Sequence, residues 1–588
     1  MKKIALYFLL FFFADNAIGQ YYLRGQVKDE KSQGLQNAKI FLHSVKAFYY
    51  SGTYGGFGIT VLKPYDSLTI SLDGYETRTL RVKSDEWQNI ILKLSASNVS
   101  KARPKLISIT KDTKQTSKYN WFTADETYFQ LVENSFVNAA VYPNTGFALN
   151  VNKASYSNVR RFLNMESSVP PDAVRIEEMV NYFNLYYNEP EKGDVFKMAS
   201  QLTSCPWDDQ KQLLYLNISA KKLVLDKVPP CNFVFLIDVS GSMDMPNRLP
   251  LLKAAFQMFV KNLRAIDTVS IVTYGGTVGI WLEPTSGAKK EDILEAIESL
   301  NAAGDTPGAS AIRAAYQLAG STFIKGGNNR VVLATDGDFN VGENTEKGLE
   351  ELIAKQRQSG IYLTCLGVGM GNFKDSKLQS LAKKGNGNYA YLDDIREAEK
   401  VLVKELTQTF YAIADNVSMN VNFNPSMVKQ YRLIGFDNKK EAVIDSDSDM
   451  EGGEIGSGNS TLAIFEIIPT QQNLFTRNTT VADDIATVSL QYTTDTTKFK
   501  LSCKITDNYL PVDTIDQDLK FATAVAMFGL KLKQSQYIPA TLDWPFIKTF
   551  AIRVADKNNY LQQEFLRLID KAEKIYNTKK KKKKTWRL

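Results

Sequence analysis

Hydrophobic and polar positions follow different periods in different parts of the chain. Between residues 20 and 94, apolar and polar residues alternate in short runs that Gly, Asp and Pro interrupt. Such runs are typical of short strands with one buried face, so we predict a small β-sandwich over residues 20–95. The next segment, residues 96–120, is polar and rich in Lys, Ser and Thr, which indicates a linker.

The period changes again in the middle of the chain. Residues 121–230 combine strand patterns with two helical patterns, one of which begins after Pro171. Residues 231–412 alternate strand-like apolar runs with helical ones. This alternation predicts a doubly wound, mostly parallel sheet covered by helices on both faces, a Rossmann-like α/β fold. Residues 413–577 return to strand patterns and then become helical.

The N-terminus has the pattern of an export signal. Lys2 and Lys3 precede the short apolar stretch 4–14, and small residues at 17–19 suit cleavage. The apolar stretch is shorter than the ~20 residues that span a membrane. We therefore predict a cleaved signal peptide, residues 1–19, rather than a retained anchor. The mature protein is expected in the periplasm or elsewhere in the cell envelope or at the outer surface, with no transmembrane segment.

Positive charge is concentrated at the C-terminus. The formal net charge is +7, and the six lysines at 579–584 together with Arg587 account for all of it. The rest of the chain is balanced, so there is no distributed basic face for nucleic acid. We interpret residues 578–588 as a solvated, disordered Lys-rich tail; binding to an anionic surface is the alternative.

The scarcity of His and the spacing of Cys exclude several chemistries. His43 is the single histidine, so neither a Ser-His-Asp triad nor an HExxH zinc site can be assembled. The four cysteines form no CxxC pair, which disfavours a zinc site, and we predict buried free thiols at Cys231 and Cys365. The absence of GxxxxGK[ST] and GxSxG motifs argues against a P-loop and a hydrolase nucleophile elbow.

Oxygen-bearing side chains gather where predicted strands end. Two strand ends, after CNFVFLI and after RVVLAT, and one Gly-rich loop supply them. The residues are Asp238, Ser240 and Ser242, then Asp336 and Asp338, then Asp305 and Thr306. Because ligands of doubly wound sheets bind beyond the carboxyl ends of the strands, we expect these side chains to converge. Hard oxygen ligands without His or Cys select Mg²⁺, Mn²⁺ or Ca²⁺; helix-capping turns are the alternative use.

This constellation resembles the metal-ion-dependent adhesion site of the von Willebrand factor type A domain. The family pattern is DxSxS followed by a distant Thr and a distant Asp. Its counterparts here are Asp238, Ser240, Ser242, Thr306 and Asp336. The resemblance implies that the hydroxyls bind a divalent cation directly and that the aspartates bind it directly or through water. Where the family pattern leads to a Ser before the Thr, this chain has Asp305, which together with Asp338 is an accessory candidate.

Two wider resemblances concern the flanking segments. The pieces GQVKDEKSQGLQNAKIFL, GGFGI and DSLTISLDGYET resemble the carboxypeptidase regulatory-like domain of bacterial envelope proteins, a non-catalytic module. Pieces such as NVNKASYSNVRRFLN, LATDGDFNVG and GGEIGSGN, spread over 145–575, are similar to one group of bacterial envelope type A proteins with an uncharacterised C-terminal domain. Asn459 stands where that group has a His, and this chain lacks the lipid-attachment Cys of many members.

These patterns divide the chain into seven segments. They are a signal peptide (1–19), a regulatory-like β-sandwich (20–95), a linker (96–120), an N-terminal flank (121–230), a type A domain (231–412), a β-rich then helical C-terminal domain (413–577) and a Lys-rich tail (578–588).

The oxygen ligands without catalytic residues around them predict a non-enzymatic binding protein. A divalent cation held there would accept an acidic side chain of a protein partner. Two alternatives stay open. A metal-dependent hydrolase would need a general base, for which Asp305 or Asp338 is the candidate. An envelope scaffold would need no cation.

Overall fold

The computed structural model contains two compact units, Met1–Ala102 and Arg103–Leu588. The structure describes residues 21–30, 32–61, 63–72, 75–93, 105–108, 114–116, 126–275, 277–303, 308–337, 346–371, 373–437, 439–442, 453–470, 484–494, 497–506 and 508–585. The predicted signal peptide lies outside these residues. Among the helices of the described ranges, none is long and apolar enough to cross a membrane.

The first unit consists of two sheets that share one core. One sheet has the strand order β4-β1-β7 and the other β3-β2-β5-β6. In β1, Leu23 and Val27 are buried while their neighbours are more exposed, as expected for a strand with one face on a core. The single histidine, His43, is exposed and lies in the turn after β2. The strands are β1 (Tyr21–Lys28), β2 (Lys39–Leu42), β3 (Ala47–Tyr50), β4 (Gly56–Val61), β5 (Tyr65–Ser71), β6 (Arg78–Lys83) and β7 (Trp87–Ile91).

The second unit contains the predicted α/β sheet. Its strand order is β17-β16-β15-β18-β19-β20, and each neighbouring pair is parallel except β16 with β17. Counted from β15, this is the order 3-2-1-4-5-6 of a doubly wound fold, which places the topological switch point between β15 and β18. The strands are β15 (Cys231–Asp238), β16 (Thr268–Gly275), β17 (Thr277–Ser286), β18 (Asn328–Thr335), β19 (Ile361–Gly367) and β20 (Tyr389–Tyr391).

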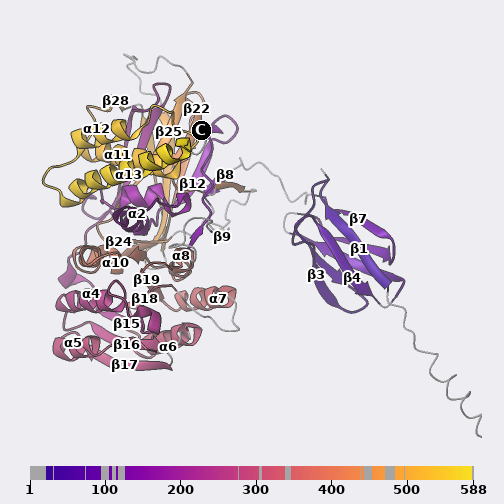
Figure 1. Cartoon of the computed structure of the whole chain (residues 1–588), viewed down its shortest axis with the longest axis horizontal. Coiled ribbons are helices and arrows are strands. Elements are labelled where there is room, and N and C mark those ends of the chain that lie inside the picture. The colour runs from indigo at the N-terminus through magenta and orange to yellow at the C-terminus, as the bar shows by residue number, and fades with distance from the viewer. Residues whose placement is uncertain are drawn as a thin grey trace, which may run out of the picture. The chain divides into compact units, whose positions relative to one another are not determined.

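Helices cover both faces of this sheet because its strands are apolar on both sides (Figure 1). Along β15, Phe233 and Phe235 pack against α4, α5 and the α9–α10 region, whereas Val234 and Leu236 pack on the other face with α6, α7 and α8. The helices are α4 (Leu249–Lys261), α5 (Lys290–Glu298), α6 (Gly308–Ser321), α7 (Glu346–Arg357), α8 (Asp375–Lys384), α9 (Ile395–Glu399) and α10 (Leu406–Phe410), with a π-helical turn (Lys400–Lys404) before α10.

The segments before and after the α/β sheet fold together. β14 pairs with β13 on one side and with β25 on the other, which joins residues 212–219 to 460–467. One sheet has the order β11-β22-β25-β14-β13-β28 and the other β23-β8-β12-β21-β26-β27, with β24 on β21. The strands are β8 (Lys105–Ser108), β9 (Lys114–Thr116), β10 (Thr127–Phe129), β11 (Val137–Asn138), β12 (Asn144–Ala148), β13 (Phe196–Ser204), β14 (Gln212–Ala220), β21 (Ala412–Phe423), β22 (Val428–Ile434), β23 (Lys439–Ala442), β24 (Gly453–Gly456), β25 (Ser460–Pro469), β26 (Asp484–Thr494), β27 (Thr497–Thr506) and β28 (Tyr509–Leu510).

A helical layer covers the outer face of the first of these two sheets. Leu213 and Tyr215 of β14 pack with the helices, while Leu214 and Leu216 face the core between the sheets. Figure 1 shows α11, α12 and α13 lying together in this layer. The helices are α2 (Ala154–Asn164), α3 (Ile176–Asn181), α11 (Gln517–Lys533), α12 (Trp544–Val554) and α13 (Tyr560–Thr585).

Two predictions about polar segments need correction. The predicted linker, 96–120, contains two strands. β8 pairs with β12 and β23, and β9 pairs with β10, so part of this segment belongs to the sheets of the second unit. The predicted disordered tail continues α13 as far as Thr585. Lysine is a good helix former, and positive charge near a helix C-terminus is favourable, so the lysine run extends the helix.

The structure confirms the predicted buried thiols. Cys231 and Cys365 are free and buried, as predicted, and Cys205 is free and buried too.

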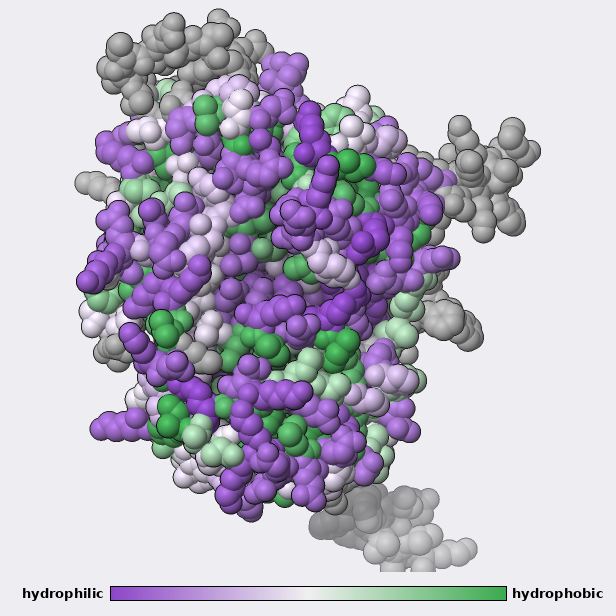
Figure 2. Space-filling model, turned by 90° about the vertical axis from the view of Figure 1, so that its left-hand side faces the viewer, coloured by the Kyte–Doolittle hydropathy of each residue, from purple (hydrophilic) through white to green (hydrophobic). Residues whose placement is uncertain are grey.

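Figure 2 shows a face of the protein on which hydrophilic residues predominate and hydrophobic residues form small, separate groups. Small apolar groups of this kind are normal on protein surfaces.

Candidate metal centre

The candidate centre lies at the switch point of the α/β sheet. Asp238 is the last residue of β15, and Asp336 directly follows β18, the strand that pairs with β15 in parallel. Both strands therefore deliver a carboxylate to the same edge of the sheet. Crevices at such points are where doubly wound sheets bind ligands. The structure thus brings together Asp238 and Asp336, one residue from each of the two predicted strand ends.

Asp238 is fully buried and held by hydrogen bonds. Its Oδ1 accepts from the backbone N–H of Ser240 at 2.9 Å, and its Oδ2 accepts from Thr335 Oγ1 at 2.9 Å. Burial raises the pKa of Asp238 from 3.8 to about 6, because the hydrogen bonds offset only part of the desolvation and the nearby Asp336 adds repulsion. The carboxylate is thus ionised at neutral pH in a place where a counter-charge is favourable.

The serine hydroxyls connect Asp238 to Asp336. Ser240 Oγ lies 3.1 Å from Ser242 Oγ, and Ser242 Oγ donates to Asp336 Oδ2 at 3.0 Å. Ser240 and Asp336 are buried, whereas Ser242 is exposed. Two carboxylates and two hydroxyls therefore form one cluster that opens to solvent on the Ser242 side.

The chemistry of this donor set fits a hard divalent cation. Within the part of the chain that the structure describes, no group of three or more His, Cys, Asp and Glu side chains is placed to hold a metal ion. The candidate centre is of a different kind, because two of its four described side chains, Ser240 and Ser242, carry hydroxyls. Oxygen donors of this sort suit Mg²⁺, Mn²⁺ or Ca²⁺.

Three predicted residues lie outside the described residues: Thr306, the accessory candidate Asp305, and Asp338. The neighbouring backbone is nevertheless described. Ala303 donates its N–H to the carbonyl oxygen of Val239 at 2.6 Å, which ties the segment after α5 to the end of β15.

Arg248 is a site residue that the sequence interpretation missed. It directly precedes α4, and its Nη1 donates to Asp336 Oδ2 at 2.7 Å. One feature of the sequence could have indicated the role of Arg248, namely its position just before a predicted helix. A cation at a helix N-terminus opposes the helix dipole, so an arginine there indicates a nearby anion.

The loop after β19 links the candidate centre to the flanking segment. The carbonyl oxygen of Met370 accepts from Arg248 Nη2 at 3.0 Å, and the N–H of Gly371 donates to Glu126 Oε1 at 2.8 Å. Glu126 is in turn held by Arg161 of α2 through two hydrogen bonds, of 2.7 and 2.8 Å. Residues of the N-terminal flank thus fix one rim of the centre.

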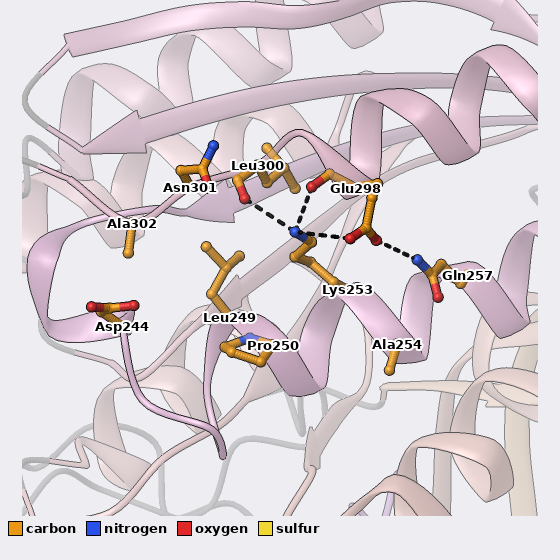
Figure 3. A pocket seen from close by; sticks show the side chains of 10 residues that line it. All are labelled: Asp244, Leu249, Pro250, Lys253, Ala254, Gln257, Glu298, Leu300, Asn301 and Ala302. Atoms are coloured by element: carbon orange, nitrogen blue, oxygen red, sulfur yellow. Dashed lines mark hydrogen bonds and ion pairs between the residues drawn. The ribbon is translucent and has the colours of Figure 1, made fainter.

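An open groove lies beside the loop that carries Ser242. One face of α4 and the segment that leaves α5 line it, and its volume is about 360 Å³. Figure 3 shows Lys253 between the two walls, with its Nζ donating to the carbonyl oxygens of Glu298 and Leu300. Asp244 lines the groove away from this lysine and is exposed. The volume is at the lower end of the range of ligand pockets.

Three protein families match consecutive parts of the chain. Residues 122–215 match the family "von Willebrand factor", residues 232–405 match "von Willebrand factor type A domain", and residues 408–575 match "Uncharacterized protein YfbK, C-terminal". The second match coincides with the α/β sheet and its helices.

Individual known proteins are also similar to parts of this chain. The chain is 38% identical over 468 residues to the Uncharacterized protein YfbK of Escherichia coli (strain K12), covering 76% of this chain and 81% of that protein. It is 28% identical over 204 residues to inter-alpha-trypsin inhibitor heavy chain H2 of Mesocricetus auratus, covering 33% of this chain and 21% of that one. A solved von Willebrand factor type A structure from Catenulispora acidiphila has a TM-score of 0.36 at 13% identity, covering 64% and 94% of the two chains. The match to YfbK, at 38% identity over 76% of this chain, shows that this chain belongs to the YfbK family of von Willebrand factor type A domain proteins.

Proposed function

We propose that this protein is an exported, non-enzymatic binding protein that uses a divalent cation to engage an acidic group of a protein partner in the cell envelope. Type A domains commonly bind a divalent cation such as Mg²⁺. Asp238, Ser240, Ser242 and Asp336, with Thr306 added from the family pattern, are the proposed ligands. Export rests on the N-terminal sequence pattern.

The observation that carries the proposal is the mixed donor set at the switch point. The two described carboxylates only balance the charge of a divalent cation, and the hydroxyls of Ser240 and Ser242 add none. A cation in such a shell keeps affinity for a further anionic ligand. The exposed side of Ser242 and the groove beside it give a partner access.

The flanking segments support a binding role rather than catalysis. Glu126 and Arg161 hold the loop at residues 369–371, so the N-terminal flank shapes the rim of the centre. We propose that the first unit is a regulatory-like module that adds a further non-catalytic domain. A hydrolase would need a general base, and both described carboxylates of the centre already accept hydrogen bonds from neighbouring groups.

A metal-free scaffold is the second candidate function, and one observation favours it. Arg248 forms an ion pair with Asp336 at 2.7 Å, so one of the two carboxylates has a counter-charge without any cation. This candidate predicts that chelators leave both stability and partner binding unchanged.

Titration of the full-length chain with Mg²⁺ tests the proposal. Because a ligand that binds only the folded state stabilises it by RT ln(1 + [L]/Kd), a hundredfold excess over Kd gives about 2.7 kcal/mol. We expect Mg²⁺ or Mn²⁺ to raise the melting temperature of the wild-type protein and to leave that of Asp238→Ala unchanged.

Asp267→Ala is the matched control for this titration. Asp267 lies at the opposite end of the same sheet, where it accepts from the N–H of Cys231 and pairs with Arg264. The control should lose stability but keep the full response to the cation. A wild-type protein that responds to neither cation would favour the scaffold.

A further inference from the structure

Arg248 lies inside the candidate metal centre, where it joins three segments. Its Nη1 donates to Asp336 Oδ2 at 2.7 Å and to the carbonyl oxygen of Ser242 at 2.6 Å. Its Nη2 donates to the carbonyl oxygen of Met370 at 3.0 Å. One guanidinium thus contacts the loop after β15, the end of β18 and the loop after β19.

Packing holds this guanidinium in place. The side chain of Arg248 is 6% exposed, and that of Asp336 is 1% exposed. A Cβ on Gly369 would lie 2.5 Å from Arg248 Nε, so the arginine fills the space that this glycine leaves open. Gly369 also has a φ of +82°, which favours glycine. The positive charge therefore stays beside Asp336 instead of moving into solvent.

The positive charge of Arg248 changes the net charge of the centre. Among its described residues, Asp238 and Asp336 carry one negative charge each and Arg248 carries one positive charge, which leaves one net negative charge. A divalent cation turns this into one net positive charge. The same centre without Arg248 would become neutral on binding the cation.

Building on the proposed metal-dependent function, we infer that Arg248 makes the centre selective for a divalent cation together with an acidic ligand. Its charge repels the cation at short range in a partly buried site, so the cation alone binds weakly. Among the described residues, the same charge leaves the loaded centre positive, so a carboxylate is attracted to it. Because coupling between two ligands is reciprocal, the carboxylate strengthens cation binding by the same factor.

Calorimetric titration of the full-length chain with Mn²⁺, with and without excess acetate, tests this inference. Chloride keeps the ionic strength constant, because salt screens charges. We expect acetate to raise the Mn²⁺ affinity of the wild-type protein several-fold. Arg248→Gln should bind Mn²⁺ alone about tenfold more tightly than the wild type and should lose most of the acetate effect.

Two variants separate the charge of Arg248 from other effects. Arg248→Lys keeps the charge and should resemble the wild type in both titrations. Arg264→Gln removes a charge that pairs with Asp267 at the opposite end of the sheet, and it should leave Mn²⁺ affinity and acetate coupling unchanged. Melting curves of the four proteins confirm that each is folded.

The outcomes distinguish this inference from the proposed function. Equal Mn²⁺ affinities of the wild type and Arg248→Gln, or weaker binding by the variant, would overturn the inference while leaving the metal centre intact. An acetate effect of the same size in both proteins would overturn it as well. Absence of Mn²⁺ binding in the wild type and in Arg248→Gln would overturn the proposed function and this inference with it.

Discussion

Replacing Arg160 by methionine is expected to lower the free energy of unfolding by about 3–5 kcal/mol. Arg160 of α2 pairs with Asp393 at 2.5 Å, with Glu397 at 2.7 Å and with Glu564 of α13 at 2.8 Å. All four side chains are at most 8% exposed. Without the guanidinium, three buried carboxylates lose their shared counter-charge, and the α/β sheet loses one of its contacts with the helical layer.

Chemical denaturation at neutral pH measures this effect, and Arg396→Met is its control. Arg396 also pairs with Asp394 and Glu564, but its side chain is 51% exposed. Exposed pairs contribute about 0–1 kcal/mol, so this variant should be nearly as stable as the wild type. Equal losses in the two variants would show that the buried cluster around Arg160 contributes no more to stability than the exposed pairs of Arg396.

Asp238→Asn is expected to stabilise the protein in the presence of chelator, by at most about 3 kcal/mol at pH 7 and above. Burial raises the pKa of Asp238 to about 6 from 3.8, so the folded state holds an ionised carboxylate at a cost. Asparagine keeps an acceptor for the N–H of Ser240, and Thr335 Oγ1 can accept from its amide. The variant should gain stability and lose its response to Mg²⁺ together.

The pH dependence of this effect has a defined sign. Because the pKa of Asp238 is higher in the folded state, its contribution to stability is fully present below about pH 4 and is lost as the pH rises through about 6. The advantage of Asp238→Asn over the wild type should therefore grow between pH 4 and pH 7. Denaturation curves in chelator across this range measure it.

Asp336→Asn provides the contrasting control for that experiment. Asp336 pairs with Arg248, whose side chain is 6% exposed, so removing the carboxylate leaves a buried cation without its partner. This variant should lose about 3–5 kcal/mol instead of gaining stability. If Asp238→Asn were destabilised to the same extent, the account of Asp238 as a carboxylate kept ionised at a cost would be wrong.

The α/β fold could be predicted from the sequence because its signals are local. Each strand of the sheet is a short apolar run next to a helical pattern, and this alternation predicts parallel pairs such as β15 with β18. The strand ends carry Asp238 and Asp336. The rule that ligands bind beyond the carboxyl ends of the strands in doubly wound sheets was therefore enough to predict that these two residues lie close together.

The joint fold of the two flanks could not be predicted, because its contacts are distant in sequence. Leu213 to Leu216 of β14 read as an ordinary strand, yet β25, which pairs with them, lies beyond the whole α/β sheet. No local pattern distinguishes such a partner from a neighbouring strand. Arg160, similarly, reads as a surface position of an amphipathic helix, and only the packed structure surrounds it with carboxylates.

The central claim is that Asp238, Ser240, Ser242 and Asp336 hold a divalent cation. Crystals of the full-length chain grown with Mn²⁺, measured near the manganese absorption edge, test it most directly. We expect an anomalous difference peak among these four side chains, at bonding distance from the hydroxyls of Ser240 and Ser242, and no such peak in crystals of Asp238→Ala. A wild-type map without a peak there, with Arg248 still paired with Asp336, would contradict the account.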